Sequence, residues 1–315
     1  MDYQKATTLM ESGDTVEGFY ILKTVSAKVT SNGHPFLSAV VLDRHGEIDA
    51  KAWDYAGPIN DANAGEVIWL QGSVTTYKGA LQLKIERLRL AEEGDSFDIS
   101  ELVPTAPIDP AAMLDDVRAL INSIADPDYR SVAQALLDRH EASFRSIPAA
   151  KSVHHSFLSG LLMHTGNMMK LADFLAGLYG DTVDRSLLLA GTFAHDLQKE
   201  SEFTFSQLGL VTDYSDQGYL LGHLVMGAQE AAEVCHALKI PAEKAVLLQH
   251  MILSHHGEPE HGAAVKPMCA ESELLSYIDL IDSRMEIYQE ALQKLQPGEW
   301  SDRIFALDKR IYRHP

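Results

Sequence analysis

The segment Leu187–Glu200 reads LLLAGTFAHDLQKE and ends an apolar helical run with a His-Asp pair. Apolar residues recur along it with the spacing of a helix that faces a core, and His195 and Asp196 follow them directly. An ionised carboxylate beside a core costs several kcal/mol unless a cation compensates its charge. A divalent metal ion does this well, so the pair predicts a metal site inside a helical domain.

Histidines and aspartates in similar apolar surroundings lie on both sides of this pair. Of the 14 histidines, 10 lie between His154 and His261, which favours a metal or phosphate site in this region. The residues that can join the pair are His164, His223, His255, His256 and Asp279. Such nitrogen and carboxylate ligands suit Mn²⁺, Fe²⁺ or Zn²⁺ better than Ca²⁺. Asp282, one turn after Asp279, is left open as an alternative ligand.

The composition is that of a soluble globular protein with two domains or one large one: 315 residues, 46% hydrophobic and 23% charged. No apolar run reaches the roughly 18 residues that a membrane span needs, so no membrane partner is expected. The opening MDYQKATTLMESGD lacks the layout of a signal peptide, and 2 cysteines cannot make a disulfide framework. A cytoplasmic location is therefore expected.

The net charge of −19 is unevenly spread along the chain. Residues 1–90 hold 9 Lys/Arg and 11 Asp/Glu, a net of −2, whereas the rest holds 17 and 34, a net of −17. An acidic surface is a poor partner for a phosphate backbone unless metal ions or a basic groove intervene. A polyanion is therefore expected to dock more easily on the N-terminal part.

Residues 14–92 are rich in β-branched and aromatic residues and predict five short strands. Asn32-Gly33 and Lys78-Gly79 supply turns, and an irregular segment separates the third strand from the fourth. This pattern is typical of a small OB-like Greek-key barrel, a fold that can stack bases on aromatic residues and contact phosphates with lysines. The candidates for nucleic-acid binding are Lys28, Phe36, Lys51, Trp53, Tyr77, Lys78 and Lys84. For Phe36 and Trp53 a core or edge role is equally open.

The segment AEEGDSFDISELVPTAPIDP, residues 91–110, interrupts the strand pattern with acidic residues and three prolines and is the candidate linker. From Pro110 onward the apolar periodicity is helical, with short connections. We expect a nucleic-acid-binding OB-fold domain over 1–95, a linker and helical lead-in over 96–150, and an all-α domain over 151–315.

The order His, His-Asp, Asp resembles the signature of the HD-domain phosphohydrolase superfamily. With an OB-like domain in front, the motifs PAAKSVHHSFLSGLLMHT, AGTFAHDLQK, LLGHL, HMILSHHGEPEHGAAVKP and ESELLSYIDLID together are similar to the YhaM-type 3′→5′ exoribonucleases. The resemblance runs from about residue 14 to about residue 292. It implies a small OB-like barrel followed by an all-α HD-type domain, and a metal-dependent phosphodiesterase that removes nucleotides from the 3′ end of single-stranded RNA or DNA.

The resemblance also implies roles for individual residues. A first metal would be held by His164, His195, Asp196 and Asp279, and a second metal or the scissile phosphate by His223, His255 and His256. Mn²⁺ is the expected cofactor, one or two ions per chain, with Fe²⁺, Zn²⁺ and Co²⁺ as alternatives. Asp196 would orient the attacking water and Lys199 would stabilise phosphate charge. Lys151 and His155 are further candidate phosphate contacts.

Gln198 departs from the family pattern, which usually reads HD-x-G-K. Glycine there permits either a positive φ or a close approach of the backbone, and a glutamine in the left-handed conformation would cost about 1 kcal/mol. We expect no loss of metal ligands, and the placement of Lys199 and the room for substrate stay open. Two other functions stay open: an HD phosphohydrolase of nucleotides or cyclic dinucleotides, and a non-catalytic factor that binds single-stranded nucleic acid. The preference for RNA or DNA and the formation of a homo-oligomer are also open.

Overall fold

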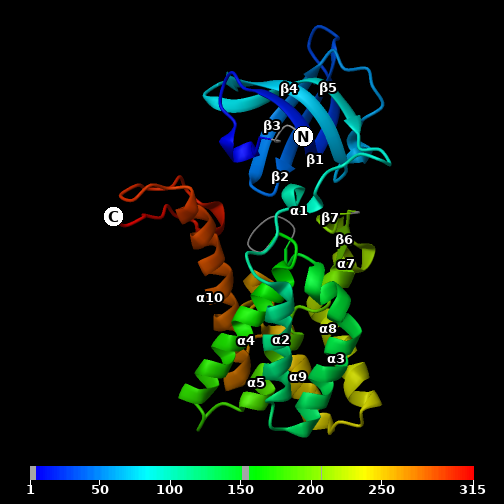
Figure 1. Ribbon diagram of the computed structural model, residues 1–315. Helices are drawn as coiled ribbons and strands as arrows, with labels where there is room; N and C mark the ends of the chain where they lie inside the picture. The colour runs from blue at the N-terminus through cyan, green and yellow to red at the C-terminus, as the bar shows by residue number, and fades with distance from the viewer. Residues whose placement is uncertain (1–4, 151–155, 207) are drawn as a thin grey trace. The chain divides into compact units, whose positions relative to one another are not determined.

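The computed structural model describes residues 5–150, 156–206 and 208–315 and divides into two compact units (Figure 1). The first unit comprises the chain up to Thr105 together with Phe205–Thr212. The second comprises Ala106–Thr204 and Asp213–Pro315. Within the described part of the chain, none of the helices combines the length and hydropathy that a membrane crossing requires.

The first unit is a closed five-stranded barrel with the strand order β1-β2-β3-β5-β4, in which β4 also pairs with β1. Its strands are β1 (Thr15–Val29), β2 (Pro35–Asp43), β3 (Gly46–Trp53), β4 (Val67–Tyr77) and β5 (Ala80–Leu90). The contact between β3 and β5 is parallel and the other four are antiparallel. Short helices η1 (Thr7–Leu9), η2 (Asp61–Asn63) and α1 (Ile99–Leu102) complete the unit. The predicted OB-like barrel is confirmed.

Buried apolar residues alternate with outward-facing residues along the strands, and the buried ones form the interior of the barrel. In β2, Leu37, Ala39 and Val41 are buried, while the residues between them face outward. The strands β4 and β5 shift register beside Gly72, where a Cβ atom would lie 2.3 Å from the carbonyl oxygen of Lys84. Only glycine allows so close an approach of two backbones.

The second unit is a bundle of helices. Its helices are α2 (Pro110–Asn122), α3 (Pro127–Ser146), α4 (Gly160–Leu178), α5 (Arg185–Ala194), α6 (Lys199–Glu202), α7 (Asp216–Leu220), α8 (Gly222–Ala237), α9 (Ala242–Ser254), α10 (Ala270–Gln293), η3 (Pro259–His261) and η4 (Phe305–Leu307). Strands β6 (Phe203–Phe205) and β7 (Val211–Tyr214) form a small two-stranded sheet that the sequence pattern did not predict. Both are too short to show a period.

Helix α5 lies at the centre of the bundle and contacts α3, α4, α9 and α10. Nine of its ten residues are buried, and Phe193 packs edge-on against Phe144 of α3 with ring centroids 5.6 Å apart. Gly191 allows α9 to approach, because a Cβ atom there would lie 2.7 Å from Met251 Cε. The Asp184 side chain caps the start of α5 by accepting hydrogen bonds from two backbone amides. The end of this buried helix therefore fixes His195 and Asp196 in the interior.

Candidate metal centre

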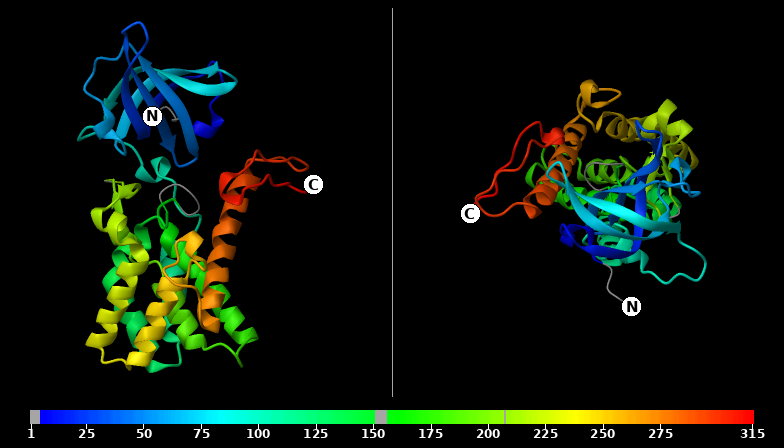
Figure 2. Two further views of the ribbon diagram at one scale, coloured as in Figure 1. Left: turned by 180° about the vertical axis from the view of Figure 1, so that it is seen from behind. Right: turned by 90° about the horizontal axis from the view of Figure 1, so that it is seen from above.

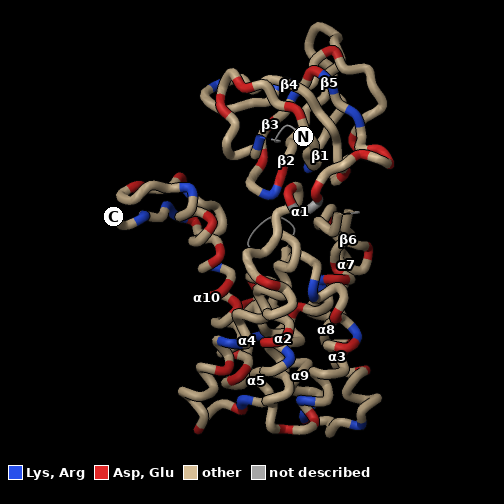
Figure 3. The backbone as a smooth tube through the Cα atoms, viewed as in Figure 1, with Lys and Arg blue, Asp and Glu red and all other residues tan. Residues whose placement is uncertain are grey.

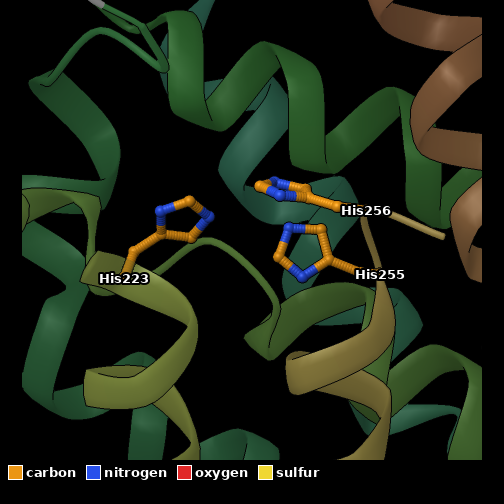
Figure 4. A group of neighbouring side chains, drawn as sticks. All are labelled: His223, His255 and His256. Atoms are coloured by element: carbon orange, nitrogen blue, oxygen red, sulfur yellow. The ribbon is translucent and has the colours of Figure 1, made fainter. Parts of the chain in front are cut away.

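The structure brings the seven predicted metal ligands together at the centre of the helical unit. They come from α4, from the junction between α5 and α6, from the start of α8, from the end of α9 and from α10. His164, His195 and Asp196 form one group that could hold a metal ion, and His223, His255 and His256 form a second. In Figure 4 the three rings of the second group point toward one another from α8 and from the end of α9.

Asp196 lies between the two groups, and each of its carboxylate oxygens faces one of them. Oδ2 is 3.2 Å from His195 Nε2 and 3.7 Å from His164 Nε2. Oδ1 is 3.3 Å from His223 Nε2 and 3.6 Å from His255 Nε2. The carboxylate could therefore contribute one oxygen to each group, a role beyond the single first-metal ligand that the sequence suggested.

Backbone carbonyls orient two of the imidazoles. His195 Nδ1 lies 2.7 Å from the carbonyl oxygen of Thr192, and His255 Nδ1 lies 2.7 Å from that of Ile252. A carbonyl oxygen can only accept, so Nδ1 is the protonated nitrogen in both rings. This leaves Nε2, the atom directed at Asp196, as a lone-pair donor for a metal.

Carboxylates orient the two other imidazoles in the same way. His164 Nδ1 donates to Asp282 Oδ2 at 2.7 Å, and His223 Nδ1 donates to Glu202 Oε1 at 2.8 Å. Asp279 lies on the opposite edge of the His164 ring, with Oδ1 3.4 Å from Nε2. Asp282 therefore orients the His164 ring, and Asp279 is the carboxylate beside Nε2, the nitrogen that also faces Asp196. The sequence reasoning missed Glu202, because nothing local connects it to a histidine 21 residues later.

Several buried polar atoms at this centre have no hydrogen-bond partner among the described residues. They are Asp196 Oδ1, His223 Nε2, His255 Nε2 and His256 Nδ1. Each unsatisfied buried group costs about 1–3 kcal/mol, so four of them around one point need a compensating ligand. A divalent transition metal accepts imidazole nitrogen and carboxylate oxygen together, and the donors present fit such an ion.

The charges of the ligands suit a cation as well. Burial would raise the pKa of Asp196, but the neighbouring His195 ring and the Lys199 ammonium hold it well below its usual range. Burial lowers the pKa of His255 far below its usual value and lowers that of His256 to about 4. The central carboxylate is therefore ionised and these two imidazoles are neutral, which are the states that bind metal.

Lys199 is held at the same carboxylate. Its Nζ lies 2.6 Å from Asp196 Oδ2, and its side chain is 13% exposed. Burial would lower the pKa of Lys199, but the charge of Asp196 raises it, so the ammonium stays protonated. A positive charge is thus present beside both ligand groups, and its contact with a phosphate stays a prediction.

Gln198 carries no left-handed strain. Its backbone has φ −75° and ψ 5°, so the left-handed conformation, one of the two alternatives, is not adopted. Gln198 precedes α6 directly and adopts a nearly helical backbone, which any residue tolerates. Its side chain instead donates a hydrogen bond to Glu230 Oε2 at 2.7 Å.

The barrel brings five of the seven candidate nucleic-acid contacts to one outer face. Strand register pairs Lys28 with Phe36 and Phe36 with Trp53, and the two rings stack with centroids 5.0 Å apart. Two residues before Trp53 on β3, Lys51 pairs with Lys84 of β5. Trp53 is 49% exposed, so its alternative role as a core residue is not observed.

Tyr77 and Lys78 lie apart from this face, at the turn between β4 and β5. Lys78 Nζ is 5.4 Å from the centroid of the Tyr77 ring, which is 57% exposed. Lys151 and His155, the remaining candidate phosphate contacts, lie outside the described residues.

A cavity of about 720 Å³ also opens on the barrel. Phe19, Trp69 and Phe97 line it together with the carboxylates of Glu17, Asp43, Asp95, Asp98 and Glu101. Carboxylates repel a phosphate backbone, so the face with Phe36, Trp53 and the lysines is the better candidate for a polyanion.

Residues 161–284 match the family model of the HD domain, and this range contains all seven predicted metal ligands. HD domains bind divalent metals, and the match indicates a metal-dependent phosphohydrolase. The chain thus combines a closed five-stranded OB-like barrel with a helical HD domain.

Three solved structures illustrate the similarity to known proteins. The second OB-fold domain of replication protein A from Methanococcus maripaludis is 11% identical, with 30% of this chain and 100% of that chain covered and a TM-score of 0.23. A replication protein A heterotrimer bound to ssDNA is 15% identical, covering 29% and 68%, with a TM-score of 0.21. A putative aspartyl-tRNA synthetase from Leishmania major Friedlin is 12% identical, covering 54% and 30%, with a TM-score of 0.21.

Proposed function

We propose that this protein is a metal-dependent 3′→5′ exonuclease that hydrolyses the phosphodiester bonds of single-stranded RNA, and of single-stranded DNA as a second substrate. The observation that carries the proposal is the position of Asp196, whose two oxygens face two separate groups of histidines. Two adjacent cation sites are typical of enzymes that cleave phosphodiesters by in-line displacement. The motif order similar to that of YhaM-type exoribonucleases supports the same reaction.

The ligands divide between two cations. His164, His195 and Asp279 would hold the first, His223, His255 and His256 would hold the second, and Asp196 would serve both. When bound, such cations lower the pKa of water and stabilise the negative charge of the phosphate in the transition state. Mn²⁺ is the proposed ion because the ligands mix imidazole and carboxylate.

The chain itself contributes orientation and charge. Asp282 and Glu202 fix the rings of His164 and His223 through Nδ1, and so keep Nε2 directed at the cations. Lys199 adds a positive charge at Asp196 that can stabilise an anionic substrate. On the barrel, the stacked pair Phe36 and Trp53 offers a platform for bases, and the adjacent lysines a track for phosphates.

The test is a trimming assay on matched RNA and DNA single strands that carry a 5′ label, with Mn²⁺ and the full-length protein. We expect stepwise shortening from the 3′ end, and its abolition by Asp196→Asn. Asp181→Asn, an exposed aspartate remote in sequence from every predicted ligand, serves as the matched control and should trim like the wild type.

Three outcomes would contradict the proposal. Trimming by Asp196→Asn at the wild-type rate would refute the mechanism. Hydrolysis of nucleotides or cyclic dinucleotides with intact oligonucleotides would favour the small-molecule phosphohydrolase. Binding of single strands without hydrolysis, in protein that contains metal, would indicate a binding factor.

A further inference from the structure

Helix α10 carries exposed apolar side chains in addition to the apolar strip that the helical unit buries. Leu275 and Ile278 point into the bundle and are fully buried. Tyr277 and Leu280, on the opposite side, are 52% and 47% exposed, and Ile281 and Met285, beside the buried strip, are 47% and 48% exposed. These side chains leave an apolar strip along α10 exposed within its own unit.

This exposed strip, here called the α10 face, consists of Tyr277, Leu280, Ile281, Met285 and Tyr288. Its members recur at intervals of three and four residues, which places them along one side of the helix. The pattern is that of a seam between two helices.

The C-terminal segment extends the α10 face. Residues 300–312 fold back on themselves through bridges between Trp300 and Tyr312 and between Ile304 and Lys309, and we call this segment the C-terminal hairpin. It packs on the end of α10, where Arg313 donates to the carbonyl of Leu292 at 2.9 Å (Figure 2). Lys309 Nζ lies 5.6 Å from the Tyr288 ring centroid, so the two surfaces are continuous.

The hairpin adds large exposed side chains to this surface. Trp300 is 58% exposed, Phe305 97% and Tyr312 43%. A soluble monomer rarely exposes an apolar patch above a few hundred Å². Aromatic side chains contribute about 150–250 Å² each when buried, so the α10 face and the hairpin together approach the roughly 800 Å² per partner of a stable interface.

The distribution of charge along α10 and the C-terminal hairpin indicates which partner this surface would bind. Residues 294–315 carry 5 Lys/Arg and 3 Asp/Glu, a net of +2 in a chain of net −19. Lys309, Arg310 and Arg313 form no ion pair with a described carboxylate. Glu273 lies in the first turn of α10, at the other end of the helix, and is exposed. Figure 3 shows this contrast between Lys and Arg in the hairpin and the acidic residues along α10.

We propose that the α10 face and the C-terminal hairpin bind the same surface of a second copy of this chain, with the two α10 helices antiparallel. A two-fold axis at the centre of the face, between residues 282 and 283, relates Glu273 of one copy to Leu292 of the other. Leu292 is where the basic hairpin packs, so each hairpin meets the acidic end of the other helix. The acidic residues along α10 repel a phosphate backbone, so the surface favours a protein partner over nucleic acid.

The test measures the mass of the full-length protein at micromolar concentration by sedimentation and light scattering. The wild type should have the mass of a dimer, and Ile281→Asp should raise the dimer dissociation constant by about thirtyfold or more. Val246→Asp changes a 63% exposed valine of α9 outside the face and should leave the dimer intact. Lys309→Glu should weaken the dimer, and adding Glu273→Lys should restore it.

Several results would overturn the proposal. One is a wild type that is monomeric throughout the micromolar range. Another is an Ile281→Asp variant that dimerises as tightly as the wild type and has the same melting temperature as Val246→Asp. Loss of single-strand binding in Lys309→Glu at unchanged mass would assign the hairpin to nucleic acid instead.

Discussion

The side chain of Gln198 donates a hydrogen bond to Glu230 Oε2 at 2.7 Å and so ties the segment after the His-Asp pair to helix α8. Glu230 Oε2 also lies 2.8 Å from Nε2 of His140, whose Nδ1 lies 2.8 Å from Glu200 Oε1. Both ring nitrogens of His140, a residue of α3 that is 4% exposed, thus contact carboxylates. This network joins three helices around the segment that carries Asp196 and Lys199.

Replacing Gln198 should therefore weaken the fold instead of relieving strain. Gln198→Ala removes a hydrogen bond to a charged acceptor, and we expect the free energy of unfolding to fall by about 1–2 kcal/mol. Gln198→Gly should lower it at least as much, because a residue at φ −75° gains nothing from glycine. Urea unfolding measures both variants. A glycine variant more stable than the wild type would show that the backbone here is strained after all.

The protonation of His140 makes the stability of the helical unit depend on pH. Burial would lower the pKa of His140, but its hydrogen bonds to Glu200 and Glu230 raise it to about 9. Since the pKa of histidine in an unfolded chain is about 6.5, this contribution is complete below about pH 6.5 and is lost as the pH rises through 9. The loss is at most about 3 kcal/mol, because one pKa unit corresponds to about 1.36 kcal/mol.

The measurement is urea unfolding of the wild type and His140→Gln between pH 6 and about pH 10. The wild type should lose more stability over this range than the variant does. Parallel curves for the two proteins would show that His140 is not protonated in the folded state.

Asp196 should be needed for both cations, whereas His255 should be needed for one. We expect Asp196→Asn to lose both metal ions, because each oxygen of the carboxylate faces a different group of histidines. His255→Ala should keep the ion held by His164 and His195. Elemental analysis after dialysis against Mn²⁺ gives the ion count per chain. Two ions in Asp196→Asn would disprove the shared position of this carboxylate.

Replacing a carboxylate that orients a histidine ligand should weaken metal binding less than replacing a ligand itself. Asp282→Asn and Glu202→Gln disturb the Nδ1 hydrogen bonds of His164 and His223, and each should weaken metal binding by about 10–100-fold. Asp279→Asn should weaken it more, since Asp279 lies on the Nε2 side of His164. Competition with a chelator measures all three. Equal affinity of Asp279→Asn and the wild type would remove Asp279 from the ligand set.

The parts of this molecule that local pattern determines could be predicted, and the parts that depend on distant contacts could not. Alternating residues and turns such as Lys78-Gly79 indicated the barrel, and apolar runs around His164 and His195 indicated buried helices. The hydrogen bond between His164 and Asp282 joins residues 118 apart in the sequence, so only the folded chain shows which aspartate orients the ring. The conformation of Gln198 stayed open because a glycine in related sequences does not prove a positive φ.

The stacked pair on the barrel should account for much of the affinity for single strands. Trp53 is half exposed and stacks on Phe36, and base stacking on an aromatic residue contributes about 1–3 kcal/mol per base. Trp53→Ala should therefore weaken single-strand binding by about fivefold or more. Lys51→Ala, one pair along the strand, should instead reduce the slope of log affinity against log salt by about 0.7. Fluorescence anisotropy at several salt concentrations separates the two effects, and Tyr77→Ala at the distant turn serves as the comparison. If Tyr77→Ala weakens binding while Trp53→Ala does not, the strand binds near the β4–β5 turn instead of on this face.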